Sequence, residues 1–495
     1  MTSQKNILQL HESYNAGVPD ERIFGGFMEH MGRCVYQGVF EPGHPQADAA
    51  GYRLDVLEAL KGLRFTAMRY PGGNFASGYH WRDGIGPREK RPKTRELAWQ
   101  SVESNAFGTE EYLSLVRRMG WSPMLTANLG TGSPEEARDW VEYCNAPAGT
   151  RVSDLRGGPP HGVKLWCLGN EMDGPWQLGH VPARDYAIRA QQAGKMMKDC
   201  DPGLELVASG SCSTGLPTYM EWDREILEYL GDLADYVSLH RYSANREDDT
   251  PHFLAEGLRI ERQIQEMDAA CRFVQAKRRS GKRAYLCFDE WNVWYKNMEM
   301  NGAGKEAPRL IEEVYNLEDA LVVAQYLNAF LRHADSVKIA NLAQIVNVIA
   351  PLLAESRGVL KQSTYHAFAM VSNRRGGSSL TPKLTGPTYD ARDLKEVPVL
   401  DASALLDGTR LKVFVVNRDG KGEQSLEIRL AGRELRTLER GEVLSGKDPK
   451  AANTWDSPAK VAPQPFGDAV FQGGTATVNL PPLSFTALEF HLEKR

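Results

Sequence analysis

Long apolar runs are missing from this sequence, and none reaches the roughly 18 residues that a transmembrane helix needs. The longest candidate, residues 342–354, is interrupted by Gln344, Asn347 and Pro351. The opening residues, MTSQKNILQLHES, also lack the apolar core of a secretory signal. We therefore expect a cytoplasmic protein that has no membrane partner.

Cysteine is scarce, and its spacing matches no familiar site. The 7 cysteines are odd in number and scattered along 495 residues, which is typical of reduced thiols rather than of a disulfide framework. No CxxC or HExxH motif occurs, so no metal site is predicted. The segment GGFMEHMG is not the GxGxxG turn of a dinucleotide site, so no cofactor is predicted.

An excess of positive charge is also missing. Lys and Arg number 59 against 64 Asp and Glu, for a net charge of -5, so the chain has no basic footprint and we expect no nucleic-acid partner. Apolar residues make up 42% and charged residues 25%, which is ordinary globular composition. The length fits several domains, or one large barrel with an appendage.

What the sequence does contain is a regular alternation of strand-like and helix-like segments. The helix-like segments carry apolar residues at the helical period, and Ser133 before Pro134 is typical of a capped helix start. The strand candidates are residues 22–29, 65–70, 123–130, 163–169, 205–210, 235–242, 283–291 and 336–344; the helix candidates are 55–63, 109–120, 134–144, 183–200, 258–279 and 317–334.

Eight strands that alternate with helices predict a parallel (β/α)8 TIM barrel with long loops, over residues 18–380. A doubly wound open sheet is the rival, and it would favour a glycine-rich phosphate turn that is missing here. Residues 381–495 change to β-branched and alternating runs split by Asp-Gly and Pro turns. They predict a C-terminal all-β sandwich of jelly-roll type.

Polar side chains recur where the predicted strands end. In a barrel these ends form one face, which is where active sites lie. A core does not need polar groups, because burying them costs free energy unless they are satisfied. The residues at these ends include Glu29, Arg69, Asn74, Asn128, Asn170, Glu171, Ser209, His240, Tyr242, Asp289, Glu290, Trp294, Gln344 and Asn347.

Two of these side chains form a pair with a specific chemistry. Glu171 ends the run KLWCLGNE and Glu290 ends AYLCFDE, on the fourth and seventh strands, which face each other across an eight-stranded ring. Two facing carboxyl groups, one protonated and one ionised, are what glycoside hydrolysis requires. Trp176, Trp291 and Trp294 are candidate platforms for sugar rings.

Each residue alone also has a structural interpretation. Asn-Glu after a strand is more often a helix cap or a solvated loop, and a lone His240 is more often a satisfied core histidine. Arg69 by itself could pair with a buried carboxylate such as Glu29. The joint occurrence of these residues at strand ends is what favours a sugar hydrolase.

Six blocks in order carry a family resemblance. They are FMEHMGRCVYQGVFEPGHP, MRYPGGNFASGYHWRDGIGPREKRP, WCLGNEMDGPWQLGH, DYVSLHRY, FDEWNVWY and AQIVNV. The chain resembles the α-L-arabinofuranosidases of glycoside hydrolase family 51 over nearly its whole length. The resemblance implies a retaining enzyme with Glu171 as acid/base and Glu290 as nucleophile. Residues implied to hold the furanose or to line its pocket are Glu29, Arg69, Asn74, Asn170 (at the 2-hydroxyl), His240, Tyr242, Trp294 and Gln344.

The resemblance further implies an exo-acting enzyme that releases terminal non-reducing α-L-arabinofuranosyl residues from arabino- and arabinoxylo-oligosaccharides. It implies a homo-hexamer, and a strand within residues 1–17 that joins the C-terminal sandwich. Two alternatives stay open on the residues alone. One is a β-xylosidase or endoglucanase on the same scaffold, and the other is a catalytically silent sugar-binding protein.

Overall fold

The computed structural model describes residues 5–494 and contains a closed barrel of eight parallel strands. Around the ring, each strand pairs with its neighbours in chain order, and β12 closes on β3. The predicted TIM barrel is therefore confirmed, and each observed strand overlaps its predicted range. The barrel strands are β3 (Gly25–Phe27), β4 (Ala67–Tyr70), β7 (Ser122–Ala127), β8 (Leu165–Leu168), β9 (Glu205–Ala208), β10 (Tyr236–Ser243), β11 (Tyr285–Val293) and β12 (Val337–Ala343).

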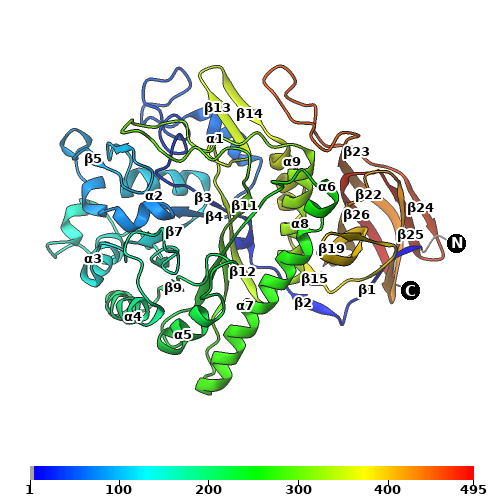
Figure 1. The fold of residues 1–495 in the computed structure, drawn as a ribbon, viewed down its shortest axis with the longest axis horizontal. Helices are drawn as coiled ribbons and strands as arrows, with labels where there is room; N and C mark the ends of the chain where they lie inside the picture. The colour runs from blue at the N-terminus through cyan, green and yellow to red at the C-terminus, as the bar shows by residue number, and fades with distance from the viewer. Residues whose placement is uncertain (1–4, 495) are drawn as a thin grey trace.

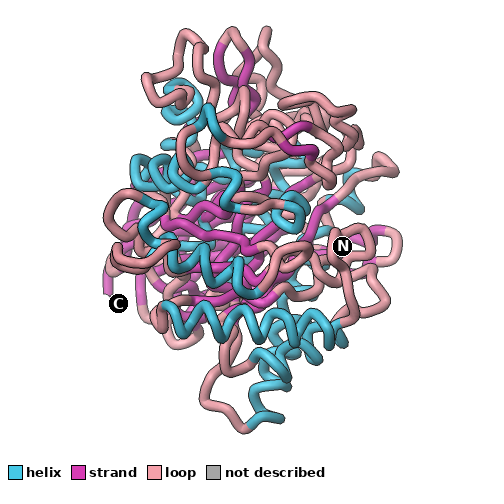
Figure 2. The backbone as a smooth tube through the Cα atoms, turned by 90° about the vertical axis from the view of Figure 1, so that its left-hand side faces the viewer, coloured by secondary structure: helices cyan, strands magenta, loops and turns pink. Residues whose placement is uncertain are grey.

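The helices lie outside the strands, as Figure 2 shows, and they bury their apolar faces against the barrel. The side chain of Ser133 accepts from the backbone N–H of Glu136, which confirms the predicted cap of α3. The helices are α1 (Leu54–Lys61), α2 (Thr109–Met119), α3 (Pro134–Asn145), α4 (Ala183–Cys200), α5 (Glu221–Leu230), α6 (Thr250–Phe253), α7 (Glu256–Arg278), α8 (Leu317–Arg332) and α9 (Ser363–Ser372). Short 3₁₀ helices are η1 (Glu21–Phe24), η2 (Asn74–Gly78), η3 (Trp81–Gly84), η4 (Arg88–Lys90) and η5 (Ser153–Arg156).

The sequence did not predict helices α5, α6 and α9. The buried residues Trp222, Ile226 and Leu230 of α5 do follow the helical period, so the signal was present. Helix α9 is different, because eight of its 10 residues are buried and it has almost no polar face. A helix that is buried all round shows no period to detect.

The C-terminal region forms two sheets that share one core of Leu, Val, Ile and Phe side chains, as expected for a sandwich. Figure 1 shows the first strand, β1, in blue beside the orange and red strands of this region. One sheet has the order β2 (Asn15–Gly17), β15 (Ser378–Leu380), β19 (Leu400–Asp407), β20 (Arg410–Asn417), β26 (Ser484–Lys494), β22 (Arg433–Ser445) and β23 (Gln464–Pro465). The other has β16 (Lys383–Thr385), β1 (Asn6–His11), β21 (Gln424–Ala431), β25 (Thr475–Leu480) and β24 (Ala469–Gln472).

Three two-stranded ribbons complete the fold. They are β5 (Thr94–Arg95) with β6 (Val102–Glu103), β13 (Leu352–Glu355) with β14 (Gly358–Lys361), and β17 (Thr388–Ala391) with β18 (Leu394–Pro398). Among the described residues, no helix is long and apolar enough to cross a membrane.

The sandwich packs on the barrel through the buried helix α8. Arg418 of the sandwich donates to the side-chain oxygen of Gln325 on α8 at 2.7 and 3.1 Å. Asn328, also on α8, donates to Asp401 at 2.7 Å and accepts from Ser403 at 2.7 Å. The side-chain oxygen of Gln325 and the side-chain amide of Asn328 thus have partners across this interface, which limits their desolvation cost.

The barrel interior has two levels. A small apolar cluster from β7 to β12, which includes Met124, Cys167, Cys287 and Ile339, fills the lower part. The polar side chains of the candidate site lie beyond it, toward the carboxyl ends of the strands. The apolar layer thus supports the site from below and keeps it dry.

Candidate active site

One pocket of about 860 Å³ opens at the carboxyl ends of the barrel strands. The family resemblance assigned ten residues to the site, as catalytic groups or as the wall around the sugar. Eight of the ten line this pocket, and they come from segments far apart in the chain. The other two, Arg69 and Asn170, are 0% and 2% exposed and bond to the lining residues Glu290 and Asn74. The eight are Glu29, Asn74, Glu171, His240, Tyr242, Glu290, Trp294 and Gln344.

The turn after β8 delivers Asn170 and Glu171. Gly169 has a φ of +85° and Glu171 a φ of +44°, so the chain turns sharply through the left-handed region as the strand ends. That region is costly for a residue with a Cβ, and such residues persist where the surrounding structure holds them. Here the turn points Asn170 inward and leaves the Glu171 carboxyl partly exposed at the pocket.

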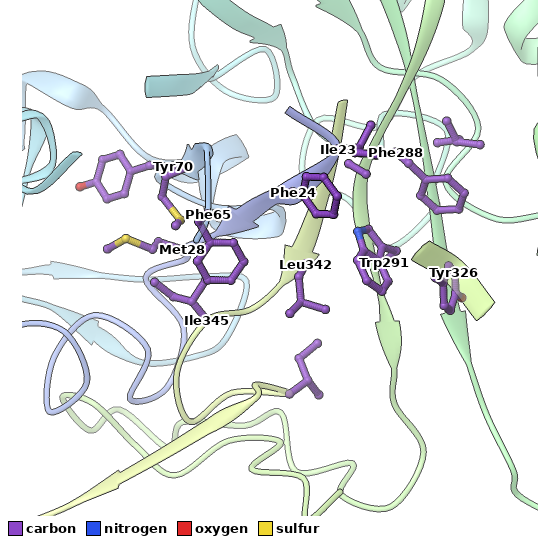
Figure 3. Close-up of a cluster of buried hydrophobic side chains, with 14 of the residues drawn as sticks. Ile23, Phe24, Met28, Phe65, Tyr70, Phe288, Trp291, Tyr326, Leu342 and Ile345 are labelled. Carbon is purple, nitrogen blue, oxygen red and sulfur yellow. The ribbon is translucent and has the colours of Figure 1, made fainter. Parts of the chain in front are cut away.

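A β-bulge in β11 sets the direction of Glu290. The pairing of β11 with β10 shifts register between Cys287 and Glu290, and its pairing with β12 shifts between Phe288 and Trp291. Both aromatic rings pack on Tyr326 of α8, outside the barrel, although an odd number of positions separates them (Figure 3). The extra residue of the bulge therefore lets Asp289 and Glu290, which are consecutive, both face inward.

The same bulge corrects one prediction from the sequence. Trp291 is 0% exposed and packs against Tyr326 and Phe330 in the core, so it is no platform for a sugar. Trp176 and Trp294 do line the pocket. Trp294 is held by a bond from its indole N–H to the carbonyl of Asn297, at 2.8 Å, and by an edge-to-face contact with Tyr242.

Glu290 is held by two donors. The Arg69 guanidinium lies 2.6 Å from Oε1, and the Tyr242 hydroxyl donates to Oε2 at 2.9 Å. Arg69 also donates to the side-chain oxygen of Asn170 at 2.6 Å. Arg69 therefore contacts Glu290 and not Glu29, which the sequence had offered as a partner. An ionised, fully oriented carboxylate is the state that a nucleophile needs.

Glu171 has a different environment. Its Oε1 lies 2.9 Å from Nδ1 of His240, and its Oε2 accepts from the indole N–H of Trp176 at 2.7 Å. One carboxylate oxygen of Glu171, one of Glu290 and a ring nitrogen of His240 all lie within 4.8 Å of one another. The two carboxyl groups thus converge from opposite sides of the ring onto one small volume.

Glu29 is a third carboxyl group in the pocket, and it has an unusual proton affinity. Burial, together with the charge of Glu290, raises the pKa of Glu29 to about 8. Its Oε1 accepts from the backbone N–H of Phe75 at 3.0 Å and from the indole N–H of Trp99 at 3.1 Å. Gln344 lies on its other oxygen at 3.4 Å. Glu29 is therefore a neutral group that can donate to a sugar hydroxyl near pH 7.

Comparison with known proteins agrees with this geometry. Residues 59–257 match the family model described as α-L-arabinofuranosidase 1 domain, and residues 289–484 match the α-L-arabinofuranosidase C-terminal domain. The second match begins inside β11, so it takes in the end of the barrel as well as the sandwich.

Full-length relatives cover the chain from end to end. The intracellular exo-α-(1→5)-L-arabinofuranosidase 1 of Bacillus subtilis is 42% identical over 98% of this chain and 99% of its own. The exo-α-(1→6)-L-arabinofuranosidase of Bifidobacterium longum is 40% identical over 98% of this chain and 97% of its own. A solved family 51 α-L-arabinofuranosidase from Bifidobacterium longum superposes with a TM-score of 0.94 at 37% identity, covering 99% and 100% of the two chains.

The chain belongs to the α-L-arabinofuranosidases of glycoside hydrolase family 51. Its members are glycoside hydrolases, so the protein is an enzyme and the silent binding protein considered from the sequence is set aside. The family membership also agrees with a site built from carboxyl groups.

Part of the wall of this arabinofuranosidase pocket was not found from the sequence. Trp99 contacts Glu29 from a loop between β5 and β6, a segment without periodicity that gives no signal of its own. The remaining wall residues are mostly apolar or small and, apart from Arg241 on β10, come from loops: Met31, Gly73, Leu97, Ala98, Leu178, Cys212, Ser213, Thr214, Ala244, Arg246, Met300, Ile311 and Ile349.

Glu171, His240 and Glu290 are also close enough to hold a metal ion. Burial alone would lower the pKa of His240, but the charges of Glu290 and Asp289 and its hydrogen bonds raise that pKa well above its ordinary value. A protonated imidazole cannot act as a metal ligand. The prediction that this arabinofuranosidase binds no metal stays a prediction.

Proposed function

We propose that the enzyme is a retaining, exo-acting α-L-arabinofuranosidase. It would release terminal non-reducing arabinofuranosyl residues from arabino- and arabinoxylo-oligosaccharides by double displacement. The observation that carries the proposal is the convergence of Glu171 and Glu290, whose oxygens lie within 4.8 Å. Retaining glycosidases hold their two carboxyl groups about 5 Å apart, whereas inverting enzymes leave room for a water molecule between them.

In the first step, Glu290 attacks the anomeric carbon while Glu171 gives a proton to the leaving oxygen, and the glycosidic bond breaks. A covalent arabinofuranosyl-enzyme results. In the second step, Glu171 takes a proton from water, the water oxygen bonds to the anomeric carbon, and Glu290 leaves. Arg69 and Tyr242 hold Glu290 in place for this attack, because each donates to one of its oxygens.

The remaining polar wall fits one terminal furanose. Glu29, Asn74 and Gln344 present donors and acceptors to the pocket, and we assign them to the hydroxyl groups of the sugar. Asn170, whose side chain also donates to Asn74 at 3.3 Å, is assigned to the 2-hydroxyl, where a contact strengthens in the transition state. His240 and Trp294 complete the wall beside the two catalytic glutamates.

The test is hydrolysis of 4-nitrophenyl α-L-arabinofuranoside by the wild type, Glu171→Ala and Glu290→Ala, with and without azide. Azide should rescue Glu171→Ala and give the α-configured azide, because it replaces water in the second step. With Glu290→Ala, any azide product should have the β configuration. Rescue of Glu171→Ala with β product would overturn retention, and an active Glu290→Ala would overturn the assignment of the nucleophile.

Hydrolysis assays of the wild-type enzyme on several substrates identify the sugar that it releases. Arabinan-derived and arabinoxylan-derived oligosaccharides should release arabinose. Hydrolysis of 4-nitrophenyl β-xyloside and cello-oligosaccharides should be at least 100-fold slower, which is a difference of about 3 kcal/mol in activation free energy. The relatives act on different linkages, since one is named for α-(1→5) and another for α-(1→6) bonds. Faster cleavage of the xyloside would favour the β-xylosidase alternative.

Two further proposals concern the setting of the enzyme. We infer a cytoplasmic location, because the Bacillus subtilis relative is named intracellular and all seven cysteines are free thiols. We also infer a homo-hexamer from the family resemblance. Sedimentation velocity measures the mass of the assembly, and a monomer at micromolar concentration would contradict the hexamer.

A further inference from the structure

Asp289 contacts both His240 and Arg69, the two side chains that bond to the catalytic glutamates, and it has no role in the mechanism so far. The bulge in β11 turns it inward beside Glu290, and it is 1% exposed. Its Oδ1 lies 3.2 Å from Nε2 of His240, and its Oδ2 lies 3.2 Å from Nε of Arg69. The thiol of Cys167 lies 3.9 Å from Oδ2. One buried carboxylate thus contacts the two cationic side chains of the site.

Each of these two side chains reaches a catalytic glutamate. Arg69 contacts Oε1 of Glu290 at 2.6 Å, and His240 contacts Oε1 of Glu171 at 2.9 Å. Two chains of contacts therefore start at Asp289, one ending on the nucleophile and the other on the acid/base. We propose that Asp289 is a positioning residue that sets both catalytic carboxyl groups, by fixing the guanidinium of Arg69 and the imidazole ring of His240.

The hydrogen on Nε2 of His240 follows from the charge of Asp289. Burial would raise the pKa of Asp289, but the charges of Arg69 and His240 hold that pKa below its ordinary value. An ionised carboxylate only accepts hydrogen bonds, so Nε2 of His240 must carry a hydrogen. The opposite nitrogen, Nδ1, is then the one that shares a proton with Glu171.

This arrangement bears on the acid step. Oε2 of Glu171 already accepts from Trp176, so the proton that protonates the leaving oxygen is held between Oε1 of Glu171 and Nδ1 of His240. It passes to the leaving oxygen as the glycosidic bond breaks and the bond to Glu290 forms. A proton from the attacking water restores it in the second step. Without the Asp289 charge, the pair formed by Glu171 and His240 would release its shared proton at lower pH.

Within residues 5–494, the acidic groups that act on His240 come from strand β11 and the loop after β8. They are Glu171 after β8, Asp289 on β11, and Glu290 on β11 at 3.6 Å from Nδ1, with Asp173 acting at longer range. A purely structural role for Asp289, as the ion partner of buried Arg69, is the competing interpretation. It predicts a loss of stability and a general loss of activity, with no change in how the rate depends on pH or on the leaving group.

The experiment compares Asp289→Asn with wild type on aryl α-L-arabinofuranosides whose leaving groups range from 2,4-dinitrophenol to phenol. This inference rests on the roles proposed for Glu171 and Glu290. We expect kcat/KM to fall by about 100-fold or more on poor leaving groups and by about tenfold on the best, because acid catalysis contributes roughly 10²–10⁴. The basic limb of the pH profile should move to lower pH. Equal losses on every leaving group, with the limb unmoved, would overturn the proposal.

Asp223→Asn is the matched control. Asp223 is equally buried and bonds to Ser211 at the end of β9, but it contacts neither catalytic glutamate nor their cations. Its variant should keep the leaving-group dependence and the pH limb of wild type. Glu171→Ala, run beside them, must itself show the steep dependence on leaving group. If it does not, the proposed function fails, whereas failure of Asp289→Asn alone removes only this inference.

A measurement on the wild type covers the case in which Asp289→Asn does not fold. ¹⁵N NMR of the 11 histidines, with His240→Gln to assign the signal, reports which ring nitrogen carries the hydrogen. We expect Nε2 of His240 to stay protonated across the pH range of activity. A bare Nε2 would overturn the proposal without any variant at position 289.

Discussion

The indole N–H of Trp176 donates to Oε2 of Glu171 at 2.7 Å, while 52% of the Trp176 side chain is exposed at the pocket. One ring therefore contacts the proposed acid/base and also faces the solvent, where the rest of the substrate must lie. The two residues are only five positions apart in sequence, so the loop after β8 provides both the proposed acid/base and part of the outer wall of the pocket. This contact ties aglycone binding to the orientation of Glu171.

We expect Trp176→Ala to raise KM for arabino-oligosaccharides by about tenfold, because a stacked aromatic ring is worth roughly 0.5–1.5 kcal/mol beyond its buried area. The KM for 4-nitrophenyl α-L-arabinofuranoside should change less, since its small aglycone uses less of the wall. Trp176→Phe keeps the ring and loses the N–H, so it should restore most of the KM but not the full kcat. Steady-state kinetics on both substrates checks this, and equal changes in KM for the two would speak against an aglycone platform.

Arg69 should be irreplaceable by lysine. Its guanidinium contacts Glu290, Asn170 and Asp289 from a fully buried position, and a lysine ammonium has neither the planar fork nor the reach to do so. We expect Arg69→Lys to lower kcat/KM by at least 100-fold. Arg69→Met should also lower the free energy of unfolding by about 3–5 kcal/mol, because it leaves buried carboxylates without a partner. Kinetics and urea unfolding measure the two effects, and a Lys variant within fivefold of wild type would contradict the argument.

The barrel and the convergence of Glu171 with Glu290 were open to prediction because both leave local signals. Each strand is a short apolar run, and Glu171 and Glu290 each end one of them. A ring closes those ends onto one face, so sequence position implied spatial proximity. The same logic identified Asn74, Tyr242 and Gln344, which come from strand ends that no local pattern would otherwise connect.

Other features depend on contacts that no local pattern encodes. The bulge in β11 sends Trp291 into the core, and an unbroken alternation along the strand would not reveal it. Trp99 reaches Glu29 across 70 positions of chain from an irregular loop. His30 follows Glu29 directly, yet it turns away from the pocket to Glu103 and Tyr70. The raised pKa of Glu29 is likewise a property of burial and of the Glu290 charge, which only the assembled site creates.

The interface between barrel and sandwich should affect stability without affecting catalysis. Arg418 donates to Gln325 on α8 and to the carbonyl of Pro398, and it does not line the pocket. We expect Arg418→Met to lower the free energy of unfolding by about 2–4 kcal/mol, because buried acceptors lose a charged donor. The values of kcat and KM should stay within twofold of wild type.

Arg436→Met is the comparison for that variant. Arg436 is also in the sandwich and pairs with Glu493, but both side chains are about half exposed. Such a pair contributes less than about 1 kcal/mol, so urea unfolding should barely change. If both variants lose the same stability, the buried contacts of Arg418 are not what fastens the sandwich to the barrel.

Glu29 should make the stability of the empty enzyme fall as pH rises. Its pKa is about 8 in the folded state against an ordinary value of 4.5, so the folded state keeps a proton that the unfolded chain has released. The resulting contribution is fully present below about pH 4.5 and is lost as pH rises through 8. Glu29→Gln imitates the neutral acid at every pH. The difference in unfolding free energy, wild type minus variant, should therefore decrease by a few kcal/mol between pH 5 and pH 9.

Glu103 provides a control of opposite sign for the same measurement. Burial would raise the pKa of Glu103, but the charge and hydrogen bond of His30, with the bond from Tyr36, hold that pKa below its ordinary value. Its contribution to stability is present above the ordinary pKa and is lost as pH falls. In urea unfolding, the free energy of unfolding of Glu103→Gln should therefore approach that of wild type only at acid pH. The free energy of unfolding of Glu29→Gln should increase relative to wild type only toward alkaline pH. Curves for Glu29→Gln that run parallel to wild type from pH 5 to pH 9 would mean that Glu29 is ionised in the empty pocket, and its assignment as a proton donor to the sugar would fall with it.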